Sequence, residues 1–200
     1  VGLYTAFWMA CCALAHNNIK KIFACLTASS AGIMLISCGI GGYSLAILYH
    51  ICHAFFKSML FLSFAYLISA MSEEKNLIKF GGLARLAPKI TDMILISALF
   101  SVGFPFLSGF FAKVSFIETL ELTDLSFVSA SSLCINLISL MAIIRMILKS
   151  LYGKARADEI TLSRIPSSEN YNSASFWILT SIALLGSFSI WSMYEWGNLH

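Results

Sequence analysis

The apolar run of residues 43–71 limits the fold of this chain more than any other feature. At a rise of 1.5 Å per residue, about 20 residues are enough for a helix to cross the hydrocarbon core of a bilayer. The run is longer than that. A segment surrounded by lipid must also satisfy its own backbone hydrogen bonds, which a helix does. The sequence therefore predicts a membrane-spanning helix here.

The composition extends this prediction to the whole chain. Hydrophobic residues make up 58% of its 200 residues, and charged residues make up 12%. Soluble domains have about 45–50% and about 25% of these two classes. With so few charges, a soluble fold could not cover its apolar surface. A disordered chain is excluded as well, because such chains are polar and rich in charge.

Further apolar runs predict an all-α polytopic membrane protein with about six transmembrane helices. Residues 90–120 form one of these runs, and it is interrupted at Gly103, Pro105 and Gly109. Proline removes a backbone donor and glycine permits non-helical dihedral angles, so we expect a broken helix there. The other runs cover residues 2–15, 22–40, 125–148 and 175–196.

The basic residues give the predicted helices an orientation. Of the 13 Lys and Arg residues, ten lie in alternate connections, which six crossings place on one face of the membrane. By the positive-inside rule, that face is the cytoplasm or the mitochondrial matrix. The ten are Lys20, Lys21, Lys75, Lys79, Arg85, Lys89, Lys149, Lys154, Arg156 and Arg164.

The remaining cations, Lys57, Lys113 and Arg145, lie inside apolar runs. An ionisable group at membrane depth is costly unless it has water or a partner. Arg145 lies about one turn from the basic end of its run, where a long side chain can reach the interface by snorkelling. Lys57 is in the middle of its run, where snorkelling is difficult.

Lys57 shares one helix face with His50 and His53, because their spacing is i, i+3, i+7. A row of histidine and lysine side chains in the membrane favours a proton relay. The alternative is a set of buried side chains that bond only to neighbours on their own helix. We predict no metal site, since His-x-x-His offers two ligands and no Cys, Asp or Glu with suitable ligand spacing accompanies it.

Lys113 follows the predicted helix break. Irregular backbone at membrane depth persists only where it is buried in protein or lines a hydrated cavity. Broken helices beside a charged residue are typical of ion sites in transporters. The alternative is a simple proline kink with a snorkelling lysine.

Residues 50–62, H-I-C-H-A-F-F-K-S-M-L-F-L, resemble a signature of the antiporter-like subunits of respiratory complex I, and are closest to subunit 5. Residues 18–22, 27–32, 80–83 and 109–113 are also similar to motifs of that family, in order and spacing through about Gly153. Asn18, Ala31 and Val114 depart from it, since they stand where the family usually has Asp, Gln and an acid.

The resemblance implies a proton-translocating subunit in the membrane arm of NADH:ubiquinone oxidoreductase, which couples quinone reduction to proton pumping. His50, His53 and Lys57 would form the central relay, and Lys113 would be the outlet lysine. No catalytic residue is expected in this chain, because FMN, iron–sulfur clusters and ubiquinone would bind other subunits.

The resemblance also divides the chain. Residues 1–153 would be the proton-channel helices of the second of two inverted repeats, 154–174 a polar matrix-side connection, and 175–200 a C-terminal transmembrane helix. Because the first repeat has no counterpart here, we expect a divided subunit 5. Its partners would be a chain carrying the amino-terminal half, subunit 4, other membrane-arm subunits and lipids, with no nucleic acid.

Two other functions remain open. A subunit of a multisubunit cation/proton antiporter shares the same motifs, and a structural membrane protein could carry them without using them. The drifted motifs and the frequent Phe and Cys favour the mitochondrial inner membrane, with a bacterial plasma membrane as the alternative.

Overall fold

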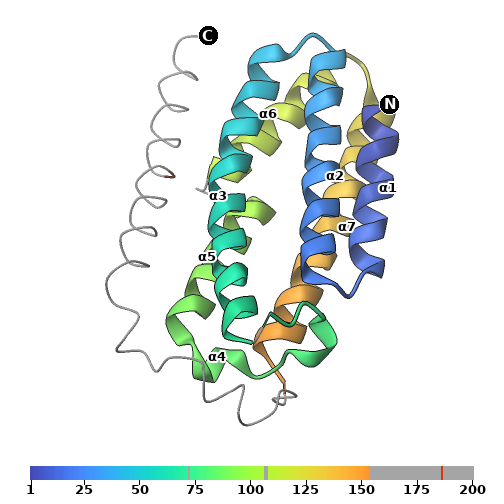
Figure 1. Ribbon diagram of the computed structural model, residues 1–200. Coiled ribbons are helices and arrows are strands. Elements are labelled where there is room, and N and C mark those ends of the chain that lie inside the picture. The colour runs from blue at the N-terminus through green and yellow to red at the C-terminus, as the bar shows by residue number, and fades with distance from the viewer. Residues whose placement is uncertain (72, 106–107, 154–185, 187–200) are drawn as a thin grey trace.

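The computed structural model describes residues 1–71, 73–105, 108–153 and 186. In these ranges the chain forms seven α-helices and one 3-10 turn, which confirms the predicted all-α fold (Figure 1). The elements are α1 (Gly2–Ala15), α2 (Ile19–Gly39), α3 (Tyr43–Ala70), η1 (Leu77–Lys79), α4 (Leu83–Leu86), α5 (Pro88–Val102), α6 (Ser108–Leu122) and α7 (Ser126–Leu151).

The long helices agree with a multi-pass membrane protein. By length and composition, α2, α3 and α7 are each able to cross a bilayer, and α1 and the apolar part of α5 are shorter. Helices α5 and α6 together occupy the predicted broken run of residues 90–120. The predicted polar connection, residues 154–174, and the predicted sixth helix, residues 175–196, lie outside the described residues.

Two of the predicted basic connections meet at one end of the bundle (Figure 1). The backbone N–H of Leu77 donates to the carbonyl of Asn17 at 2.7 Å, and that of Ile19 donates to the carbonyl of Lys75 at 3.0 Å. The Asn18 side chain then caps α2 by accepting from the N–H of Lys20 at 3.1 Å. The connection before α2 and the connection after α3 are therefore tied together.

Helices α1 and α2 pack closely because small residues line their contact. Ala6, Ala10 and Ala13 of α1 are fully buried. A methyl group added to Gly32 of α2 would lie 2.7 Å from the backbone nitrogen of Ala6. The Ser29 hydroxyl of α2 donates to the Ala6 carbonyl at 2.8 Å. Small residues allow this close approach of two backbones in a membrane.

The apolar core consists of two buried clusters. One includes Leu26 and Ile143 and extends toward the basic connections, and the other includes Ile33, Tyr49 and Phe56 and extends toward α6. All five of these side chains also line one cavity. The cavity is therefore located where the two clusters meet, inside the helical bundle.

Candidate functional site

Helix α3 contributes two buried titratable side chains to the cavity. His53 and Lys57 each expose 8% of their surface and both line the cavity, one turn apart. His50 is exposed on the same helix and is not among the lining residues. The structure thus brings together two of the three side chains predicted for the α3 relay.

Lys57 lies against aromatic rings. Its Nζ is 5.7 Å from the centroid of the Phe23 ring and 6.0 Å from that of Phe61. The two rings are themselves in contact, with centroids 4.5 Å apart. Among the described residues, the one ion pair is between Lys79 and Glu74, so no carboxylate there pairs with Lys57. The attractive interactions that the described residues offer the Lys57 ammonium group are therefore cation–π contacts with Phe23 and Phe61.

The break between α5 and α6 begins at a glycine whose left-handed backbone conformation ends α5. Helix α5 ends at Val102, and Gly103 follows in the left-handed region with φ of 83°. Its N–H donates to the carbonyls of Leu99 and Phe100, both at 3.2 Å. Pro105 follows the turn, and the next helix begins at Ser108. Glycine adopts this left-handed conformation without steric cost.

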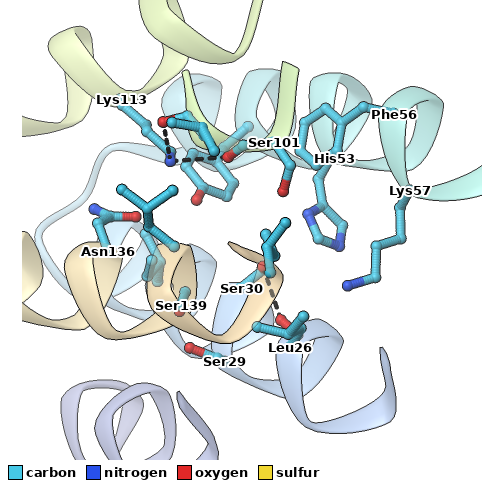
Figure 2. Close-up of a pocket in the computed structure, with 15 residues that line it drawn as sticks. Leu26, Ser29, Ser30, His53, Phe56, Lys57, Ser101, Lys113, Asn136 and Ser139 are labelled. Carbon is cyan, nitrogen blue, oxygen red and sulfur yellow. Dashed lines mark hydrogen bonds between the residues drawn. The ribbon is translucent and has the colours of Figure 1, made fainter. Parts of the chain in front are cut away.

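Lys113 of α6 reaches back to the end of α5. Its Nζ donates to the carbonyl of Ser101 at 3.0 Å and to that of Val102 at 2.9 Å, as the dashed lines in Figure 2 show. The last carbonyls of a helix lack partners within it and carry its negative dipole end. The break in the helix therefore provides a site for the cation at membrane depth.

The cavity joins the lysines of the two helices. It has a volume of about 30 Å³ and is lined by Lys57 and His53 from α3 and by Lys113 from α6. Figure 2 shows Lys57 and Lys113 on opposite sides of the view, with α7 below Lys113. A polar cavity holds a water molecule if about 10–15 Å³ is available, so this cavity has room for about two. Its other polar lining residues are Ser29, Ser30, Tyr49, Ser101, Asn136 and Ser139.

Tyr49, Asn136 and Ser139 are cavity-lining residues that were not among the predicted site residues. Asn136 offered a signal, because a carboxamide within an apolar run needs a polar partner at membrane depth. Tyr49 offered none, since tyrosine is common at the ends and sides of membrane helices. No group of three or more metal-ligating side chains occurs in the described part of the chain.

Arg145 of α7 pairs with the end of α1. Its guanidinium donates to the carbonyl of Leu14 at 2.6 Å, to that of His16 at 2.9 Å and to the Asn17 side chain at 2.5 Å. These contacts satisfy carbonyls that α1 leaves without helical partners. Arg145 therefore has a structural role beyond the snorkelling that its position predicts.

Comparison with known proteins identifies several relatives. NADH-ubiquinone oxidoreductase chain 5 of Loxodonta africana is 37% identical over 165 residues, which is 80% of this chain and 27% of the relative. The chain 5 protein of Pongo pygmaeus is 41% identical over 159 residues, 77% of this chain and 26% of the relative. That of Marchantia polymorpha is 42% identical over 118 residues, 59% of this chain and 18% of the relative. The chain thus spans about a quarter or less of the length of these relatives.

Comparison with solved structures supports the fold. A structure of the Mrp complex from Dietzia sp. matches with a TM-score of 0.76 at 18% identity, covering 100% of this chain and 44% of the other. At that identity the similarity concerns the fold alone. The model of the family described as NADH:quinone oxidoreductase/Mrp antiporter, TM, matches residues 1–139, which is more than half of the chain. This chain therefore belongs to the NADH:quinone oxidoreductase/Mrp antiporter transmembrane family.

Proposed function

We propose that this chain is a proton-translocating part of the membrane arm of NADH:ubiquinone oxidoreductase, corresponding to part of subunit 5. The observation that carries the proposal is the cavity that brings His53 and Lys57 of α3 together with Lys113 beside the helix break. Its relatives are named NADH-ubiquinone oxidoreductase chain 5, which supports the same function.

The chemistry proposed for the site is proton exchange. A lysine amine and an imidazole can each accept and release a proton, and water in the cavity can carry it between them. Lys113 would take up a proton from the cavity side, and the resulting ammonium group would be held in place by donating to the carbonyls of Ser101 and Val102. His50 is exposed on α3 and does not line the cavity, so the relay proposed for the cavity uses His53 and the two lysines.

Replacement of the two lysines tests this function. Lys57→Ala and Lys113→Ala, each introduced into the assembled complex, are expected to lower the number of protons translocated per NADH oxidised. Lys149→Ala is a suitable control, because Lys149 lies at the end of α7 and does not line the cavity. Normal translocation in both lysine variants, with assembly intact, would favour a structural role for the chain.

A subunit of a multisubunit cation/proton antiporter is the second candidate, and the similar fold found in the Mrp complex favours it. Purification separates the two. We expect the chain to copurify with subunits that contain FMN and iron–sulfur clusters and that reduce ubiquinone. Copurification with antiporter subunits that lack these groups would support the alternative.

We further propose the mitochondrial inner membrane as the location, since the chain 5 relatives are from elephants, plants and apes. The proposed partners are subunit 4, the other membrane-arm subunits and lipids. A separate polypeptide that carries the amino-terminal half of subunit 5 stays a prediction. Peptide mapping of the purified complex tests it, because a single polypeptide covering both halves would contradict it.

A further inference from the structure

Tyr49 occupies the cavity-facing position one turn before His53. Tyr49, His53 and Lys57 follow one another at intervals of four residues, all three are buried, and all three line the cavity. Side chains four residues apart on a helix lie on one face. His50 is one residue further along and is exposed. The third polar group that α3 presents to the cavity is therefore a phenol and not an imidazole.

Helix α7 forms a polar wall of the same cavity. Asn136 and Ser139 line it from α7, on the side opposite α3 (Figure 2). Ser131, Ser132 and Ser150 of the same helix each donate to a carbonyl about one turn earlier. Asn136 and Ser139 make no such bond within the described ranges, and neither does the Tyr49 hydroxyl. Their polar groups are therefore available for hydrogen bonds with water molecules in the cavity.

His53 has an unmet hydrogen-bonding requirement at this place. Its Nε2 is buried and has no hydrogen-bond partner among the described residues. A buried polar nitrogen without a partner is costly, and water usually supplies the bond. The Nζ of Lys113 is fixed by the carbonyls of Ser101 and Val102. Water in the cavity therefore needs further partners to form a connected chain between the imidazole and the amine.

We propose that Tyr49 and Asn136 are positioning residues that orient the water molecules joining His53 to Lys113. This inference rests on the proposed proton-transfer function. A proton released by His53 protonates the nearest water, each water passes one proton onward, and the neutral Lys113 amine receives the last one. The charge moves while every water keeps two hydrogens. Phenol and carboxamide groups remain neutral near pH 7, so they orient the water without retaining the proton.

Removal of the two polar groups tests the inference in the assembled complex. Tyr49→Phe and Asn136→Leu retain the size of the side chains and are expected to slow proton translocation about five-fold, the effect of losing one hydrogen bond. The rate ratio between H₂O and D₂O should change as well, which a purely structural defect would not cause. Asn136→Gln, which retains the carboxamide, should recover part of the rate.

Matched controls are available on the same helices. Tyr43→Phe removes a hydroxyl from the exposed start of α3, and Ser131→Ala removes one from a half-buried position of α7 that does not line the cavity. Both should translocate protons at the wild-type rate. If Lys57→Ala and Lys113→Ala slow translocation but Tyr49→Phe and Asn136→Leu do not, the inference is wrong and the proposed function stands. If all four translocate normally, both fail.

Direct observation of the water covers the case in which a variant does not assemble. In a high-resolution density map of the wild-type complex, we expect ordered water within hydrogen-bond distance of the Tyr49 hydroxyl, the Asn136 carboxamide and His53 Nε2. A dry cavity, or water that contacts neither Tyr49 nor Asn136, would overturn the inference.

Discussion

Gly109 packs against Phe100 so closely that a methyl group on Gly109 would overlap the carbonyl oxygen of Phe100. This contact joins the start of α6 to the end of α5. It places Lys113, one turn further along α6, beside the carbonyls of Ser101 and Val102. The glycine is thus required by close approach of two backbones, whereas Gly103 is required by its positive φ.

Gly109→Ala should therefore displace α6 from the end of α5. Overlap with a backbone atom forces a shift that costs about 1–3 kcal/mol. We expect a lower melting temperature of the complex and slower proton translocation, because Lys113 loses its carbonyl partners. Gly39→Ala in α2 is the control, since a methyl group there meets no atom within 4 Å. Equal translocation and stability in the two variants would refute this role of Gly109.

Arg145→Ala should loosen α7 from α1. The substitution leaves the half-buried carbonyls of Leu14 and His16 without their donor, which should cost about 1 kcal/mol, the lower end of the range for an unsatisfied buried group. Thermal denaturation of the complex, or the yield of assembled complex, measures the loss. Arg145→Lys should recover only part of it, because one ammonium cannot reproduce the planar arrangement of guanidinium donors. Full recovery by lysine would show that charge alone is needed.

His53→Ala should reduce proton translocation more than His50→Ala. His53 is buried and lines the cavity with Lys57 and Lys113, whereas His50 is exposed and does not. Each variant removes one imidazole from the same helix, so each serves as the matched control for the other. Proton translocation per NADH oxidised is the measurement. A larger loss in His50→Ala would mean that the relay follows the outer face of α3.

Much of the fold could be predicted from the sequence, because a membrane span has a strong local signal. The runs of residues 2–15, 43–71 and 125–148 correspond closely to α1, α3 and α7. Helix α2 begins at Ile19, before the run that starts at residue 22. Apolarity identifies the part of a helix that lies in lipid, and the helix continues through Lys20 and Lys21 beyond it.

The features of the fold and of the site that could not be predicted depend on contacts between segments far apart in the sequence. The bridge of Asn18 with Asn76 and the bonds of Arg145 to the end of α1 join residues far apart in sequence, so local patterns did not predict them. Apolar side chains surround helix α3 on every face, including the one that carries His53 and Lys57, so local patterning could not show that Tyr49 rather than His50 faces inward. The cavity itself is formed by side chains of five helices, α2, α3, α5, α6 and α7.

The connection after α3 should respond to pH through Glu74. Its carboxylate accepts from Lys79 Nζ at 2.6 Å and from the backbone N–H groups of Asn76 at 3.1 Å and Lys75 at 3.2 Å. The Lys79 bond, followed by the Asn76 N–H, lowers the pKa of Glu74 from its ordinary value of 4.5. A lowered pKa in the folded state means that the stabilising contribution is complete above the ordinary pKa and is lost as the pH falls through the lowered one.

Glu74→Gln should therefore loosen the connection after α3 at neutral pH and should have no effect on it in acid. At pH 7, the amides of Asn76, Ile78 and Lys79 should exchange with deuterium faster in the variant than in the wild type, because the charged acceptor is gone. Comparing both proteins at the same pH cancels the intrinsic pH dependence of exchange. The difference should disappear once Glu74 of the wild type is protonated. Glu73→Gln, at an exposed neighbouring position, is the control. A difference that persists in acid would mean that the carboxylate charge does not hold this connection in place.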